Sequence, residues 1–289
     1  MGTAGNSHTA SGQSTASLNA AKVVQVTGDL PAMPHIAAQV MDKLSNPNST
    51  PKDIYTLISK DQSLAARVLK VANSPYYGAS RSISSLRDAI LFMGFDAIKS
   101  LIMTAVMKGM FSAMSLSEKL LWEHSIGCGV ASKMLAEEVG FQSPDEAFLT
   151  GLMHDIGKAV LFLRIPDMMK DIMQEAYNEG TDFYEVEQQK LGFTHAEVGQ
   201  VIADKWRFAL DIEDAIANHH HPDQARSAHD LSNIVSLANS FCHKLEIGPT
   251  RKPDMDLMEL ESTKALNIDT TAIAKILEKI GSAVNGEDK

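Results

Sequence analysis

A histidine and an aspartate stand side by side in the segment GLMHDIGKAVLF, residues 151–162. Imidazole and carboxylate groups are common protein ligands of Zn, Fe and Mn. Adjacent residues of a helix point about 100° apart, so His154 and Asp155 can share a metal if the ion lies over the edge between them, at a helix end or bend. An aspartate has two oxygens and can bridge two metals. The pair therefore makes metal-dependent cleavage of phosphoesters a candidate chemistry.

Further histidines extend the pair into an ordered series along the chain. His124 precedes it, His195 follows it, and a run of three histidines fills positions 219–221. Lys158 lies one helical turn after His154, on the same face, where its ammonium group could contact a phosphate as a point charge. We interpret the histidines and Asp155 as candidate metal ligands that converge on one site.

Simpler interpretations exist for single members of this series. The histidine run precedes Pro222, and cationic side chains also suit the dipole at a helix C-terminus. Cys128, four residues after His124, is better explained as a small core residue than as a ligand. Isolated histidines, such as His243, are interpreted as surface or capped core residues. The order of the whole series across several predicted helices nevertheless favours the metal interpretation.

Composition limits the classes of function. The chain has 289 residues, 44% of them hydrophobic, and a net charge of −10. A chain this acidic lacks the positive field that binding to a phosphate backbone requires, so we expect no direct nucleic-acid binding. Two cysteines indicate no disulfide framework and favour a reducing cytoplasm. Charged residues interrupt the longest apolar stretch, and the N-terminus has no secretory apolar region, so we expect no membrane span.

Helix signals recur along the chain, and strand signals are scarce. Thr50 followed by Pro51 and Asp53, and Asp61 before an apolar helical pattern, are typical helix starts. A helix is predicted to start after Ser85 and to end at Gly94, and another to start at Ser143 and Pro144. The fold class is therefore all-α. We divide the chain into a flexible tail (1–21), an N-terminal helical bundle (22–115), a second helical part (116–247) and a C-terminal linker with a helix (248–289).

Several segments closely resemble HDOD proteins, which are bacterial helical relatives of the HD phosphohydrolases. The segments LPAMPHIAAQVM, SKDQSLAARVLKVANSPYYG and ISSLRDAILFMGFDAIKSLIM carry the resemblance in the first half, and LWEHSIG, AFLTGLMHDIGK, THAEVG and AIANHHHP carry it in the second. It covers about residues 22–245. The resemblance implies an HD-type core with an added N-terminal bundle, and a regulatory role in bacterial signalling, most often without catalysis.

The second half also resembles the HD-GYP phosphodiesterases of cyclic dinucleotides. That resemblance implies that one metal is bound by His124, His154, Asp155 and a final aspartate. It implies that a second metal shares Asp155 and is bound also by His195, His219 and His220. Lys158 matches the lysine of that family's HDxGK motif.

Two departures from the HD-GYP pattern put catalysis in doubt. The segment HPDQARSAHD stands where that family has its GYP loop, and Asn239 stands in place of the final aspartate. A neutral amide weakens the first metal site. The second site keeps three imidazoles and a carboxylate, a set that suits Fe, Mn or Zn. The site is thus expected to hold a single divalent metal or to be empty.

The leading expectation is a regulatory HDOD protein with a degenerate metal site that acts through bacterial signalling partners. The alternative is a metal-dependent phosphohydrolase acting on a nucleotide or cyclic dinucleotide, and a third possibility is a sensor whose metal sets the conformation. Tyr76 and Tyr77, in the loop SPYYGAS, are either a partner contact or a seal between the two halves, because large amphipathic rings are enriched at interfaces.

Overall fold

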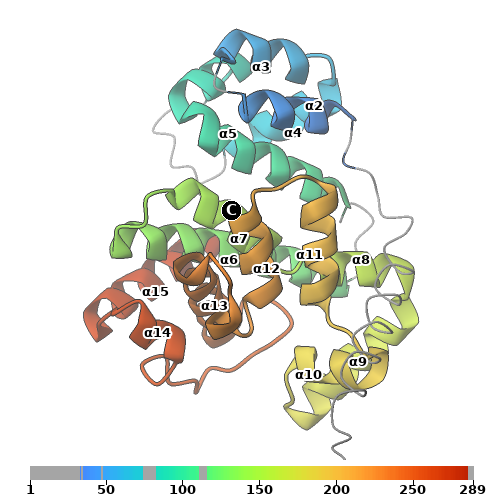
Figure 1. Cartoon of the computed structure of the whole chain (residues 1–289), viewed down its shortest axis with the longest axis vertical. Coiled ribbons are helices and arrows are strands. Elements are labelled where there is room, and N and C mark those ends of the chain that lie inside the picture. The colour runs from blue at the N-terminus through green and yellow to red at the C-terminus, as the bar shows by residue number, and fades with distance from the viewer. Residues whose placement is uncertain (1–32, 34, 47, 74–82, 111–115, 286–289) are drawn as a thin grey trace, which may run out of the picture.

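The computed structural model describes residues 33, 35–46, 48–73, 83–110 and 116–285, and every regular element in these ranges is a helix (Figure 1). The all-α prediction is confirmed. The predicted tail over residues 1–21 and the tyrosines Tyr76 and Tyr77 lie outside the described residues. No helix in the described ranges combines the length and the apolar character that crossing a membrane requires.

Four helices form a small N-terminal lobe, which stands at the top of Figure 1. They are α2 (His35–Leu44), α3 (Pro51–Ile58), α4 (Gln62–Ala72) and α5 (Leu86–Met110). The predicted helix starts are confirmed here. Thr50 and Asp53 form a reciprocal capping box at α3, and Asp61 accepts a hydrogen bond from the Leu64 backbone at the start of α4. Each cap satisfies backbone N–H groups that have no partner within the helix.

Helix α5 joins the two lobes. Gly94 was predicted to end a helix, and this prediction is confirmed, because the helical segment that begins at Leu86 stops at this residue and a second segment follows it. The glycine adopts φ 77° and ψ 177°, a conformation open to glycine, and the chain kinks there and continues as a helix to Met110. The part of α5 after the kink is largely buried and packs against α7 of the larger lobe. Ser100 of α5 donates a hydrogen bond to the Asp145 carbonyl at 2.9 Å.

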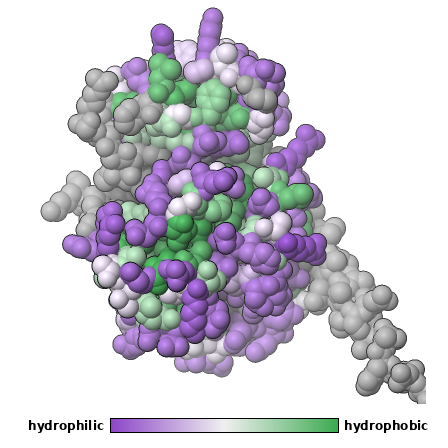
Figure 2. Space-filling view, turned by 60° about the vertical axis from the view of Figure 1, so that its left-hand side comes forward, coloured by the Kyte–Doolittle hydropathy of each residue, from purple (hydrophilic) through white to green (hydrophobic). Residues whose placement is uncertain are grey.

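The larger lobe is built around two long helices that pack together, α6 (Leu116–Val139) and α13 (His229–Lys244). The other elements surround this pair: α7 (Pro144–Met153), α8 (Ile156–Arg164), α9 (Pro166–Glu179), α10 (Phe183–Leu191), α11 (His195–Lys205), α12 (Leu210–Asn218), the 3-10 turn η2 (Pro222–Gln224), α14 (Glu261–Ala265) and α15 (Thr270–Asn285). Hydrophilic residues cover most of the face in Figure 2, and a band of hydrophobic residues crosses the larger lobe.

Candidate metal centre

His154 and Asp155 occupy the turn between two helices. Helix α7 ends at Met153 and α8 begins at Ile156, so the pair lies at a helix junction. Both side chains are buried. This is the position at which adjacent residues can aim at one point, as the sequence required.

The Asp155 carboxylate lies between two sets of imidazoles. Its Oδ2 is 3.6 Å from His124 Nε2 and 3.4 Å from His154 Nε2. Its Oδ1 is 3.1 Å from His195 Nε2 and 3.8 Å from His219 Nε2. One oxygen therefore faces each set. We call His124, His154 and Asp155 the His124 group. The donor atoms of this group lie within 4.8 Å of one another.

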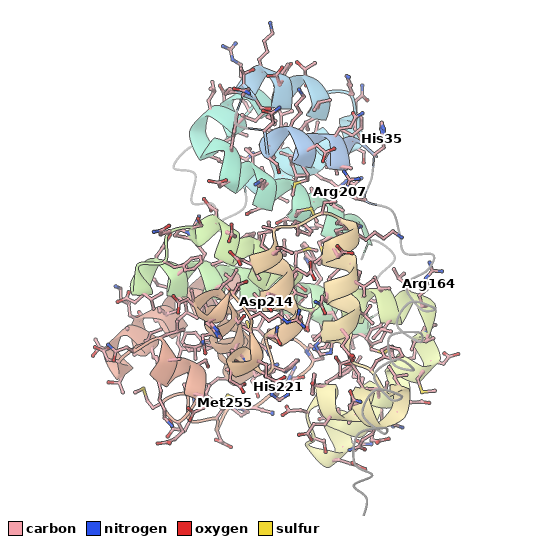
Figure 3. The ribbon with its side chains drawn as sticks, in the orientation of Figure 1. His35, Arg164, Arg207, Asp214, His221 and Met255 are labelled. Carbon is pink, nitrogen blue, oxygen red and sulfur yellow. The ribbon has the colours of Figure 1, made fainter. Side chains whose placement is uncertain are left out.

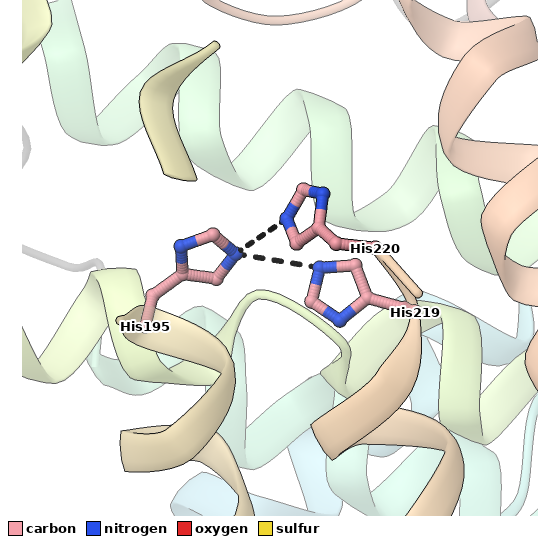
Figure 4. Close-up of side chains that lie close together, drawn as sticks. All are labelled: His195, His219 and His220. Carbon is pink, nitrogen blue, oxygen red and sulfur yellow. Dashed lines mark hydrogen bonds between the residues drawn. The ribbon is translucent and has the colours of Figure 1, made fainter. Parts of the chain in front are cut away.

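The second set, the His195 group, consists of His195, His219 and His220. Nε2 of His195 is 3.3 Å from Nε2 of His219 and 3.0 Å from Nε2 of His220 (Figure 4). His221, the last residue of the histidine run, is exposed and belongs to neither group. The structure thus brings all six predicted metal-ligand residues to one locus.

Helix ends position the residues of the His195 group. His195 is the first residue of α11, and a capping box between Thr194 and Glu197 fixes where that helix starts. His219 and His220 follow directly after the last residue of α12. The histidine run does lie at a helix C-terminus. Burial and neighbouring histidines lower the pKa of His219 well below its usual value, however, so it does not act there as a helix-capping cation.

Four of the imidazoles are held through Nδ1, each by a hydrogen-bond acceptor. The acceptors are the carbonyl of Ile247 for His124 (3.1 Å), of Gly151 for His154 (2.6 Å) and of Ile216 for His219 (2.7 Å), and Glu187 Oε2 for His195 (2.6 Å). An acceptor at Nδ1 places the ring proton there and leaves the lone pair on Nε2. Anchoring of this kind is typical of metal-binding histidines.

Glu187, on α10, is a functional candidate that was not predicted from the sequence. Its side chain is fully buried, and the same oxygen that binds the His195 ring also accepts the His195 backbone N–H at 2.7 Å. Burial lowers the pKa of His195, but the negative charges of Glu187 and Asp155 together outweigh it and the net shift is upward. The sequence does hint at its burial, because Glu187 directly follows Val186 in a helix whose residues Phe183 and Val186 are buried.

Protonation states in the centre favour a bound cation. Burial lowers the pKa of His154 to about 3, and burial lowers that of His220 well below its usual value. Burial would raise the pKa of Asp155, but the charges of His154, Lys158 and His195 hold it well below its usual value. Neutral imidazoles around an ionised carboxylate are the forms in which these groups bind metals.

Lys158 does extend toward the centre, as its spacing from His154 suggested. Its buried ammonium group donates to Asp155 Oδ2 at 2.8 Å and lies 5.1 Å from the centre of the Phe183 ring. The oxygen it binds is the one that faces the His124 group. A positive charge at this point opposes a cation on that side of the carboxylate.

Asn239 lies beside the His124 group. It is buried on α13. Burial lowers the pKa of His124, and the interaction of Asn239 with that ring opposes this shift in part. His243, one turn further along α13, was interpreted as an isolated histidine. It is half-buried and belongs to neither donor group, but its ring stacks on His124 with centroids 5.4 Å apart and planes at 17°.

The residues present fit a divalent cation. Among the described residues, His124 Nε2, His154 Nε2, Asp155 Oδ1 and Asn239 Oδ1 are buried without hydrogen-bond partners. Leaving such atoms unpaired costs free energy. On the other side of the carboxylate, the lone pairs of His195 and His219 point at each other and at Asp155 Oδ1. Lone pairs that converge in this way need a proton or a cation between them.

The chain is similar to several known proteins. The sequence profile of the HDOD domain matches residues 30–222. A crystal structure of an HDOD domain protein of unknown function from Geobacter sulfurreducens is 26% identical, with a TM-score of 0.81, and the match covers 93% of this chain and 98% of that one. A candidate phosphohydrolase from Shewanella amazonensis, 23% identical with a TM-score of 0.74 over 91% of this chain and 96% of that one, shares the fold.

Two curated proteins also match. An uncharacterised protein of Treponema pallidum is 23% identical over 222 residues, which are 76% of this chain and 43% of that protein. Ribonuclease Y 1 of Pediococcus pentosaceus is 30% identical over 118 residues, 41% of this chain and 17% of the ribonuclease. The matched segments cover less than half of either relative.

Proposed function

The chain belongs to the HDOD family, and we propose that it is a bacterial regulatory protein that binds one divalent transition metal at its HD centre and acts through protein partners. The observation that carries this proposal is the position of Asp155. One of its oxygens faces the imidazoles of the His195 group, and the other is bound by a lysine.

The His195 group and Asp155 Oδ1 would hold the metal. Three imidazoles and one carboxylate oxygen suit Fe, Mn or Zn. When bound, such an ion supplies Lewis-acid chemistry. In the chain itself, Glu187 orients His195, and the Ile216 carbonyl orients His219.

The His124 group supports catalysis poorly. A two-metal clamp would need a second cation on Asp155 Oδ2, and Lys158 is bound to that oxygen at 2.8 Å. Asn239 offers a neutral carbonyl where a carboxylate would add negative charge. Both features weaken the second position, and we infer that the centre regulates conformation or partner binding instead of hydrolysing a substrate.

A second candidate function is phosphoester hydrolysis of a nucleotide or cyclic dinucleotide. The specific observation in its favour is that both donor groups share Asp155, as a bridging carboxylate does. The match to a ribonuclease over 118 residues is in keeping with it.

Metal titration combined with a turnover assay separates the two functions. The chain, stripped with a chelator, is titrated with Mn²⁺ or anaerobic Fe²⁺ and then assayed with bis-p-nitrophenyl phosphate and with cyclic dinucleotides. Our proposal predicts binding of one ion that His219→Ala abolishes, and no turnover above that of the His219→Ala variant. Turnover that depends on His219 would establish the hydrolase instead. Absence of any binding would refute both.

A further inference from the structure

A cavity of about 510 Å³ lies between the two lobes, and none of the candidate metal ligands lines it. Its walls come from α2 and α5 of the small lobe, from the start of α7, and from the loop between α11 and α12. Arg207, in that loop, marks the level of the cavity at the junction of the lobes (Figure 3). Arg207 has φ 57°, so the loop takes a left-handed turn there.

The lining combines aromatic rings with an unpaired carboxylate. Trp206 and Phe208 line the cavity with ring centroids 6.4 Å apart. The indole Nε1 of Trp206 is buried and has no hydrogen-bond partner among the described residues. Glu146 is half-buried in the same lining, and none of the ion pairs in the described part of the chain includes it. Leu149 and Ile212 add apolar surface.

The electrostatic potential at Glu146 is negative. Burial raises the pKa of Glu146, the carboxylates of Asp211 and Asp96 raise it further, and Lys99 opposes them only in part. A ligand cation beside Glu146 would relieve both the repulsion and the lost hydration. The other basic residues of the lining, Lys205 and Arg207, are exposed, so water screens their charges from Glu146.

We propose that the cavity between the lobes binds an organic cation: a protonated amine or amidine carried on a planar apolar body. Glu146 would pair with the charge, and the rings of Trp206 and Phe208 would pack on the body and attract the cation through their faces.

The cavity also touches the far ends of the helices that carry the candidate ligands. Helix α7 begins at the cavity and ends just before His154, and α12 begins there and ends just before His219. Helix α11 starts with His195 and ends at the cavity with Lys205. Each helix is about 15 Å long by its rise per residue. If the chain binds a metal as proposed above, a small molecule in this cavity would change the metal affinity by shifting these helices.

Three small molecules of one shape test the proposed site: benzamidine, which is cationic, benzamide, which is neutral, and benzoate, which is anionic. Calorimetric titration of the full chain should show benzamidine binding about tenfold more tightly than benzamide, the effect of one charge-assisted hydrogen bond, and benzoate more weakly still. Glu146→Gln should remove the preference, and Glu185→Gln, at an exposed position of α10, should keep it. Equal or tighter binding of benzoate, no binding of benzamidine, or an unchanged preference in Glu146→Gln would overturn the proposal.

A separate titration tests whether ligand binding in the cavity changes metal affinity. The dissociation constant of Co²⁺, followed by its visible absorption, should change about threefold or more when benzamidine saturates the cavity, and by linkage Co²⁺ should change benzamidine affinity by the same factor. Identical Co²⁺ affinities with and without benzamidine would overturn the coupling. Failure of Co²⁺ to bind at all would refute the proposed metal centre, while the comparison of the three small molecules would still decide the cavity.

Discussion

Glu187→Gln tests whether the buried network around His195 prepares a metal ligand. The glutamate oxygen accepts two hydrogen bonds from His195, one from the ring at 2.6 Å and one from the backbone at 2.7 Å. Glutamine keeps the shape of the side chain but removes the negative charge. It therefore weakens both bonds and makes the imidazole less basic, while the position of α10 is expected to remain.

The expected loss follows from the bonds that change. Hydrogen bonds to a charged group contribute roughly 1.5–3 kcal/mol, against about 1 kcal/mol for neutral pairs. Loss of a partner that orients a metal-binding histidine typically lowers metal affinity about 10- to 100-fold. The two estimates agree, since tenfold in affinity corresponds to about 1.4 kcal/mol. We therefore expect the dissociation constant of Co²⁺ or Mn²⁺ to rise by about tenfold to hundredfold.

The assay is a Co²⁺ titration at pH 7.5, with circular dichroism to show that the variant is folded. Glu185→Gln is the matched control, because it removes the same charge from the same helix at an exposed position. Co²⁺ affinity of folded Glu187→Gln within twofold of the unmodified chain would show that His195 needs no orienting partner to bind a metal.

Three further predictions concern the centre. Asn239→Asp should raise metal affinity beside His124 with little change in melting temperature, because the two side chains have nearly the same shape; unchanged affinity would show that position 239 is not a ligand position. In metal-free protein, His154 has a pKa of about 3 when folded against 6.5 as the reference, so the unfolded chain binds the extra proton between these values. Urea unfolding in chelator should therefore show stability falling below pH 6.5 by about 1.4 kcal/mol per pH unit from this residue, and a flat profile from pH 7 to 5 would contradict it. Gly157→Ala should displace His195 and lower both metal affinity and melting temperature, because an added Cβ would lie 1.9 Å from the His195 carbonyl oxygen; a variant with unchanged affinity would show that α8 and α11 can separate without harm.

Much of the centre could be predicted from the sequence because its ligands are chemically distinctive. Histidine is the commonest metal ligand among the side chains, so histidines at ordered positions across several helices indicate a shared site. An adjacent His154–Asp155 pair requires a helix end, which the junction of α7 and α8 supplies. Helix caps such as Thr50 were predictable because they depend on residues three positions apart.

The remaining features depend on contacts between distant segments. Glu187 is one glutamate among many until α10 packs its carboxylate onto His195. The stacking of His243 on His124 joins α13 to α6 and does not follow from helical spacing. Gly94 does end a helical segment, as its type predicts, but the burial of the second segment between the lobes depends on tertiary packing.

A crystal structure of the metal-loaded chain, recorded at the absorption edge of the added metal, tests the central claim most directly. We expect one anomalous peak within coordination distance of His195, His219, His220 and Asp155 Oδ1, and none between His124 and His154. Peaks on both sides of Asp155 would contradict the inference of a degenerate centre, and the absence of a peak beside the His195 group would contradict the metal centre itself.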